Sequence, residues 1–160
     1  MSRTTKKHLI AHYWDILNKL YFGRSLYSFL LGKFVPYSGS IPFFVEELRP
    51  GYAKVAMRDC RKVRNHLKSI HAMALMNLAE ISGGLALHAG MDEHTRGILK
   101  SLSINFLHKA RGDTFAVCET EIRDYSSKKD VSLVIKIFSK EKEDAVAEAV
   151  ALWLVGPIKS

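Results

Sequence analysis

One stretch decides the fold of this 160-residue chain: residues 71–88, HAMALMNLAEISGGLALH. Its apolar side chains recur on nearly every side of a helix, which is typical of a helix that is buried on most sides. Gly83 and Gly84 lie inside it, and each costs roughly 1 kcal/mol against Ala in a helix interior. Close packing of another backbone or a ligand is the expected compensation. We therefore predict a central helix that ends at Gly90.

One carboxylate interrupts this apolar helix. Glu80 lies between Leu78 and Ile81, and burying a carboxylate is costly unless something compensates. Either Glu80 faces water or it takes part in chemistry. Two further polar groups lie before it in the sequence: Asn65 is six residues before His71, and His71 is nine residues before Glu80.

Upstream of the central helix, the chain is predicted to form two shorter helices. Residues 9–22 carry apolar side chains at helical spacing, and Gly23 is expected to end that helix. Residues 26–34 form a second short helix that ends before Pro36. This apolar segment either covers a pocket or packs on the outside of a sheet.

The remaining chain is predicted to be strand. Residues 43–48 and 52–58 form a hairpin across Arg49-Pro-Gly51, where Gly51 can take a positive φ. Further strands are expected at residues 98–108, 114–123, 131–139 and 145–155. Their links are too short for parallel crossovers, so we expect antiparallel hairpin neighbours.

An antiparallel sheet curled around one helix is the hotdog architecture, an α+β fold. We divide it into an N-terminal helical extension, residues 1–35, and a hotdog domain, residues 36–160, which together form a single domain. Exposed edge strands in such a sheet are commonly paired between two protomers.

Composition narrows the cellular setting. The hydrophobic content of 48% is enough for a core without disulfides, and Cys60 and Cys118 have no metal-ligand spacing. The longest apolar run, residues 26–35, is interrupted and too short to cross a bilayer. The basic start leads into an amphipathic segment with Asp15 rather than a secretory core. We predict a cytoplasmic protein with no membrane insertion and no bound metal.

The formal net charge of +8 favours anionic partners. The densest basic cluster, residues 58–68, is either a solvated face or a site for phosphates. It contains no aromatic residue on which a base could stack, which argues against nucleic acid.

The spacing of Asn65, His71 and Glu80 resembles that of the PaaI-type acyl-CoA thioesterases of the hotdog superfamily. Residues 103–113 resemble that family's strand-turn-strand after the helix, and the resemblance extends over residues 43–155. The similarity is closest to an uncharacterised PaaI-like branch, which has a comparable helical extension and the lead-in found at residues 36–39.

The resemblance implies roles for individual residues. Glu80 would be the general base for water, or the nucleophile, at a thioester carbonyl. The backbone N–H of Ala72 would bind the oxyanion at the positive end of the helix dipole. Asn65 would orient the water or the carbonyl, and His71 would shape the loop or bond near the thioester.

The resemblance also implies the ligands. Lys109 and Arg111 would meet the phosphates of coenzyme A, which enters as part of the acyl-CoA substrate, so no separate cofactor is expected. The protein would form a homodimer or a dimer of dimers. Two departures are present: Ala72-Met73 replaces the family's Gly-Gly, and only Ser101 and Ser103 could stand for the hydroxyl that some relatives supply from a partner strand.

Plainer and rival interpretations stay open. Glu80 could face water, His71 could cap the helix, and Asn65 could stabilise its own loop. A hotdog dimer could also bind acyl-CoA without hydrolysing it. A hydroxyacyl thioester dehydratase is a weaker alternative: His66 lies fourteen residues before Glu80, but no proline-rich loop precedes the helix.

Overall fold

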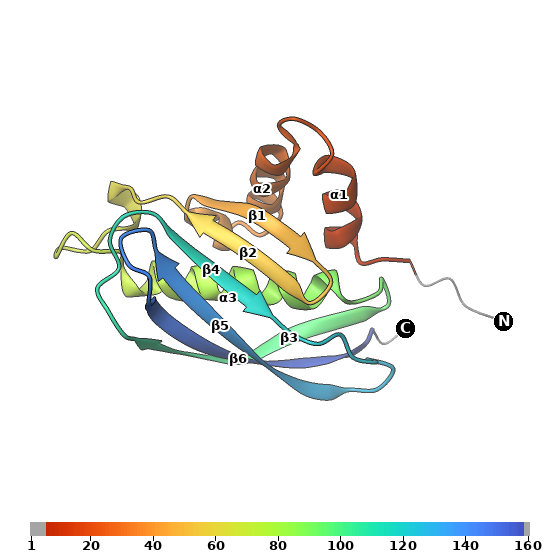
Figure 1. Ribbon diagram of the computed structural model, residues 1–160. Coiled ribbons are helices and arrows are strands. Elements are labelled where there is room, and N and C mark those ends of the chain that lie inside the picture. Colours follow the sequence, from red (N-terminus) through yellow and green to blue (C-terminus); the bar gives the residue numbers. More distant parts are fainter. Residues whose placement is uncertain (1–5, 159–160) are drawn as a thin grey trace.

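The computed structural model describes residues 6–158 and has two short helices, a hairpin, one long helix and four further strands (Figure 1). The elements are α1 (Leu9–Leu17), α2 (Gly23–Phe34), the 3-10 helix η1 (Ser38–Ser40), β1 (Phe43–Arg49), β2 (Tyr52–Met57), the 3-10 helix η2 (Arg61–Val63), α3 (Ala72–Ala89), β3 (Thr95–Phe106), β4 (Thr114–Glu119), β5 (Lys129–Ser139) and β6 (Ala145–Pro157). Strand β4 ends four residues earlier than predicted, where Thr120 donates its N–H to Gly51.

The six strands form one antiparallel sheet in the order β1-β2-β4-β5-β6-β3. The predicted hairpins β1–β2, β4–β5 and β5–β6 are confirmed, and Gly51 has the expected positive φ of 75°. The expected β3–β4 hairpin is wrong. Strand β3 pairs with β6 at one edge, while β4 pairs with β2. Because the sheet curls around a helix, the link between β3 and β4 crosses from one side of that helix to the other.

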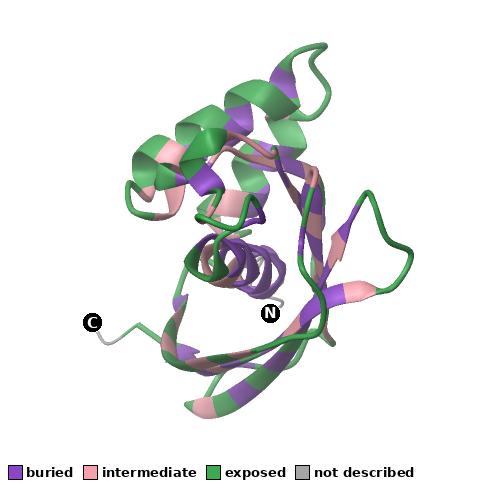
Figure 2. Ribbon diagram, turned by 90° about the vertical axis from the view of Figure 1, so that its left-hand side faces the viewer, coloured by how far each residue is buried: buried purple, intermediate pink, exposed green. Residues whose placement is uncertain are grey.

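Helix α3 is the helix around which the sheet curls, and Figure 2 shows it end-on inside the curve of the strands. Its buried residues are Ala74, Leu75, Leu78, Ala79, Ile81, Ser82, Gly83, Leu85, Ala86, Leu87 and Ala89. A Cβ at Gly83 would lie 3.2 Å from Cδ1 of Ile135 on β5, so glycine there allows close packing on the sheet. The prediction of a central helix ended by Gly90 is confirmed.

Helix α1 packs against α3, and α2 packs against β1 and α1, so the N-terminal helices lie on the side of α3 and not on the outer face of the sheet (Figures 1 and 2). Trp14 on α1 meets Tyr27 on α2 edge to face at 5.0 Å between ring centroids. The hydroxyl of Ser28 accepts the N–H of Val45 at 2.9 Å, which fastens α2 to β1. The division of the chain at residue 35 remains a prediction.

The first helix is shorter than predicted, and Gly23 begins α2 instead of ending α1. Residues 18–22 form the turn between them, and a Cβ at Gly23 would lie 1.6 Å from the carbonyl oxygen of Leu17. The turn closes only because position 23 has no side chain. Helical periodicity continued through the turn, which is why the sequence indicated one long helix.

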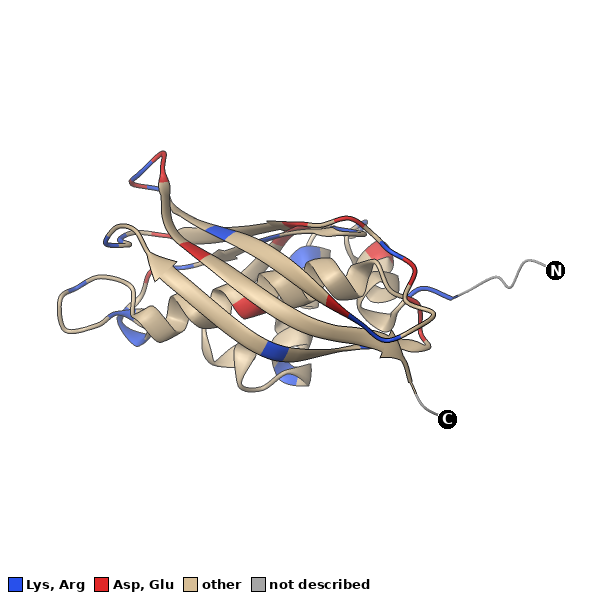
Figure 3. Ribbon diagram, turned by 90° about the horizontal axis from the view of Figure 1, so that it is seen from below, with Lys and Arg blue, Asp and Glu red and all other residues tan. Residues whose placement is uncertain are grey.

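Charges on the sheet are scattered (Figure 3). Several are paired between strands: Lys54 on β2 lies 2.9 Å from Glu46 on the neighbouring β1, and Lys100 on β3 reaches across β6 to Asp130 on β5 at 2.7 Å. Many of the other Lys and Arg residues lie in loops. Among the described residues, no helix is long and apolar enough to cross a membrane.

Candidate active site

Glu80 is held between the central helix and the N-terminal segment. It lies on α3, and its Oε2 accepts a hydrogen bond of 3.3 Å from the hydroxyl of Ser38 on η1. Asn77, one turn earlier, donates its side-chain amide to the Ser38 carbonyl at 3.4 Å. Two contacts thus join the same face of α3 to η1.

The surroundings of Glu80 change its acidity. Burial raises the pKa of the Glu80 carboxyl above its ordinary value, and the hydrogen bond from Ser38 lowers it in part. A carboxylate with a raised pKa is a stronger base once it has lost its proton. The pKa of Glu80 is therefore shifted in the direction that suits a carboxylate acting as a base.

Glu80 opens into a cleft of about 390 Å³ between α3, α1, α2 and β6. The cleft is lined by His8, Leu9, Ile10, Leu31, Phe34, Val35, Ser38, Glu80, Ile81, Gly84, Leu85, His88 and Trp153. Glu80, Gly84 and His88 follow one another at intervals of four residues, so they share one face of α3. A carboxylate is thus set in an otherwise mostly apolar cleft.

The N-terminus of α3 provides a hydrogen-bond donor. His71 is the N-cap, and its Nδ1 accepts the N–H of Met73 at 3.1 Å. The exposed Ala72 is the first residue of the helix, and its N–H has no acceptor among the described residues. This N–H lies at the positive end of the helix dipole, where an anion is stabilised.

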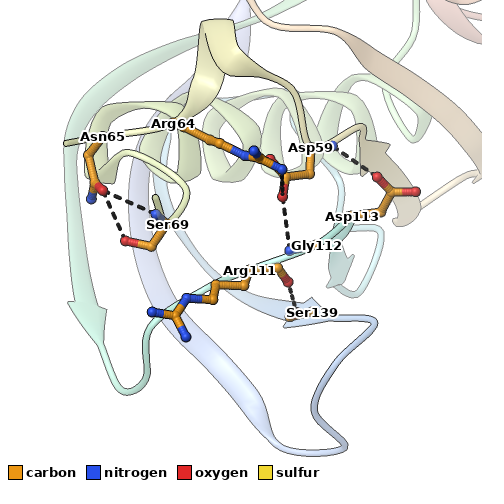
Figure 4. A network of polar contacts seen from close by, with 8 residues as sticks. All are labelled: Asp59, Arg64, Asn65, Ser69, Arg111, Gly112, Asp113 and Ser139. Atoms are coloured by element: carbon orange, nitrogen blue, oxygen red, sulfur yellow. Dashed lines mark hydrogen bonds and ion pairs between the residues drawn. The ribbon is translucent and has the colours of Figure 1, made fainter. Parts of the chain in front are cut away.

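Asn65 organises the loop before α3. Its side-chain oxygen accepts hydrogen bonds from the N–H groups of Leu67 and Ser69 and from the Ser69 hydroxyl (Figure 4). None of these groups bonds to Glu80, which contacts Ser38 instead. Within a single chain, Asn65 and Glu80 therefore do not belong to a common hydrogen-bond network.

Lys109 and Arg111 are exposed in the loop between β3 and β4, which lies against the loop before α3. Ile70 donates its N–H to Ala110 at 2.9 Å, and Gly112 donates to Asp59 at 3.1 Å. Asp59 also holds Arg64, at 2.6 Å (Figure 4). The two exposed cations are thus fixed beside the basic segment 58–68, close to the start of α3.

Comparison with known proteins places the chain in a family. The profile described as a domain of unknown function (DUF4442) matches residues 23–155. The chain belongs to the DUF4442 family. No curated protein matches it.

Solved structures similar to this DUF4442 chain have the same fold. A structural-genomics crystal structure is 28% identical, covering 93% of this chain and 99% of its own, with a TM-score of 0.81. A Pseudomonas aeruginosa protein of unknown function, described as a probable thioesterase, is 28% identical over 79% and 88% of the two chains, with a TM-score of 0.69.

A third structure is a hypothetical thioesterase from Streptococcus pneumoniae with coenzyme A. It is 17% identical over 81% of this chain and 99% of its own, with a TM-score of 0.65, and at this identity it supports the fold alone. The hotdog fold and the resemblance to an uncharacterised branch of the hotdog thioesterases are thereby confirmed.

The DUF4442 site includes residues that the sequence did not indicate. Ser38 is separated from Glu80 by 42 residues, and nothing in its local sequence points to that contact. His88 could have been found, because it lies eight residues after Glu80 on the same helical face. Ser101 and Ser103 are exposed on β3, and His66 is exposed in the loop before α3; none of the three lines the cleft.

Proposed function

We propose that this protein is a thioesterase that hydrolyses acyl-CoA, with Glu80 as the general base. The observation that carries the proposal is the half-buried carboxylate of Glu80, its pKa raised by burial, at the wall of a mostly apolar cleft. Glu80 would take a proton from water while the water oxygen bonds to the thioester carbon. The carbon–sulfur bond then breaks, and the proton passes to the departing thiolate.

The developing oxyanion would be bound by the Ala72 N–H. This donor has no intrachain acceptor among the described residues and is aligned with the dipole of α3. Removing one preorganised donor from an oxyanion site typically costs on the order of 3 kcal/mol of transition-state stabilisation. In this proposal, Asn65 and His71 act on the loop that presents Ala72.

The positions of Ala72 and Glu80 along α3 argue for a homodimer. They are eight residues apart, and a rise of about 1.5 Å per residue puts roughly 12 Å between them along the helix axis. A single thioester carbonyl cannot meet both within one chain. Each site would therefore combine Glu80 of one protomer with Ala72 and Asn65 of its partner.

Coenzyme A would enter over the loops at the start of α3. Lys109 and Arg111 are exposed there, and neither forms an ion pair within residues 6–158. Both are thus available for phosphate groups. The pneumococcal hypothetical thioesterase shares the fold and was solved with coenzyme A, and we extend that ligand to this chain as part of the proposal. Two unpaired cysteines, Cys60 and Cys118, suit the reducing cytoplasm.

A non-catalytic acyl-CoA-binding protein is the second candidate. The side-chain oxygen of Asn65 accepts hydrogen bonds only from groups of its own loop among the described residues. In addition, Ala72-Met73 replaces the Gly-Gly of the PaaI-type enzymes. Either feature would suit a protein that holds an acyl-CoA without hydrolysing it.

Turnover of short, long and aromatic acyl-CoA thioesters by the native chain and by Glu80→Gln tests the proposal. Loss of the base should lower kcat by roughly a hundredfold or more. Glu148→Gln is the matched control, because Glu148 is also partly buried but lies on β6 outside the cleft. Equal rates for native chain and Glu80→Gln on every substrate would end the thioesterase proposal. Binding without turnover would favour the second candidate, and enoyl-CoA hydration abolished by His66→Ala would favour the dehydratase.

A further inference from the structure

The cleft beside Glu80 adjoins a second hollow between α1 and α2. This groove has a volume of about 260 Å³ and is almost wholly apolar. Four residues line both hollows: Leu9, Ile10, Leu31 and Phe34. The path from Glu80 therefore continues past α2 and along the N-terminal helices, whose outer faces are exposed (Figure 2).

We propose that the cleft and the groove form one compartment for a linear aliphatic acyl chain of fatty-acid length. The inference rests on the proposed function, because Glu80 marks the end at which the thioester carbonyl would lie. An aromatic ring or a short acyl group would fill only the cleft. The groove farther along would then have no use in binding.

The chemistry of the lining favours an uncharged chain. No Lys or Arg lines either hollow. Burial lowers the pKa of both His8 and His88, so these rings are neutral at physiological pH. The Tyr27 hydroxyl, at the groove, already donates to the Ile10 carbonyl at 3.1 Å. An acyl chain with a charged end would find no counter-ion there, whereas methylene groups would find apolar contacts.

Several apolar side chains that line the groove are exposed to solvent to an unusual extent. Leu9, Tyr13, Leu30 and Phe34 are 61%, 55%, 49% and 77% exposed. Exposed apolar residues that form one contiguous patch commonly mark a binding surface, whereas isolated exposed apolar residues are normal. Their continuity with the Glu80 cleft identifies the substrate's own hydrocarbon chain as the occupant.

The ratio of kcat/KM for palmitoyl-CoA to that for butyryl-CoA tests the inference. Leu30→Asp puts a charge into the groove at a half-exposed position, and Leu30→Trp fills the groove without a charge. Leu26→Asp is the control, since Leu26 is 44% exposed on the same helix and lines neither hollow. Each methylene moved out of apolar contact costs roughly fourfold in affinity. Both Leu30 variants should therefore lower the ratio at least tenfold, and Leu26→Asp should leave it within twofold.

The outcomes separate the two proposals. Hydrolysis with the same ratio in the native chain, both Leu30 variants and Leu26→Asp would overturn the compartment and leave the thioesterase standing. If the native chain hydrolyses nothing, calorimetric titration with palmitoyl-CoA decides. Binding at least tenfold weaker in Leu30→Asp than in Leu26→Asp would then support the compartment without catalysis, whereas equal affinities would overturn it. Thermal unfolding of each variant verifies that it is folded.

Discussion

Ser38 on η1 donates a hydrogen bond of 3.3 Å from its hydroxyl to Oε2 of Glu80 on α3. This contact joins the N-terminal segment to the central helix at the carboxylate that we assign as the base. It also acts against burial, because the hydrogen bond lowers the pKa of Glu80 whereas burial raises it. The segment before β1 therefore tunes the acidity of the group it covers.

Ser38→Ala should move the acid limb of the activity profile to higher pH. Without the hydroxyl, burial acts unopposed and the pKa of Glu80 rises further. More of the base is then protonated at a given acidic pH. A profile of kcat/KM against pH measures the shift, and Ser40→Ala, an exposed serine of the same 3-10 helix, is the control. An acid limb that stays in place would show that Ser38 does not influence the ionisation on which activity depends.

Glu80→Gln should stabilise the fold at neutral pH. The pKa of Glu80 is raised in the folded state above the ordinary value of 4.5, so the folded chain holds that proton more tightly than the unfolded chain. Ionisation therefore costs stability as pH rises from about 4.5 through the folded-state pKa. The glutamine cannot ionise, so its advantage should appear above that range and disappear below it.

Urea unfolding at a series of pH values measures this difference. Glu148→Gln, which removes a partly buried carboxylate outside the cleft, is again the control. A Glu80→Gln variant that is less stable than the native chain at neutral pH would contradict the assignment of a carboxylate whose pKa is raised by burial.

The sequence was sufficient for the central helix and for most of the sheet, for physical reasons. A helix that is apolar on all sides has to be enclosed, and short turns such as Arg49-Pro-Gly51 allow only antiparallel neighbours. The partner of β3 was not predictable in this way. Alternation shows which face of a strand is buried, but it does not show which strand lies beside it.

Some residues of the candidate site could likewise be predicted from the sequence, whereas others could not. Glu80 stood out because its charge breaks an apolar pattern, and the N-terminal position of Ala72 follows from where the helix begins. The contact of Ser38 with Glu80 and the cleft under α1 and α2 arise from packing between distant segments. Asn65 was proposed as a catalytic group, and in one chain it is a loop-stabilising acceptor, so its proposed role depends on a partner protomer.

Gly23→Ala should destabilise the protein by roughly 1–3 kcal/mol, the usual cost of overpacking. Its Cβ would collide with the Leu17 carbonyl oxygen, so the turn between α1 and α2 would have to open. Gly32→Ala is the matched control within α2, because its Cβ would lie 3.5 Å from Gly39 and 3.7 Å from Phe43. Urea unfolding midpoints should fall for the first variant only. Equal midpoints would mean that the turn tolerates a side chain.

Ala72→Pro should abolish most activity without loss of stability. Proline is favoured at the first position of a helix, and His71 before it already has φ −66° and ψ 138°, a conformation that proline permits. The substitution removes only the N–H that we assign to the oxyanion, so kcat should fall by roughly a hundredfold to a thousandfold. Ala72→Ser keeps the N–H and should retain activity. A fully active, folded proline variant would rule out this donor.

Mixing two inactive variants tests whether the sites are shared between protomers. In a dimer whose sites combine Glu80 of one chain with Ala72 of the other, a mixed dimer of Glu80→Gln and Ala72→Pro has one site with both defects and one with neither. Random exchange at equal concentrations should then recover about a quarter of native activity, because about half of the dimers are mixed and each has one intact site. If each site lay within one chain, every site in the mixture would carry a defect and activity would stay at the level of the single variants. Sedimentation of the native chain as a monomer would remove the basis for sharing altogether.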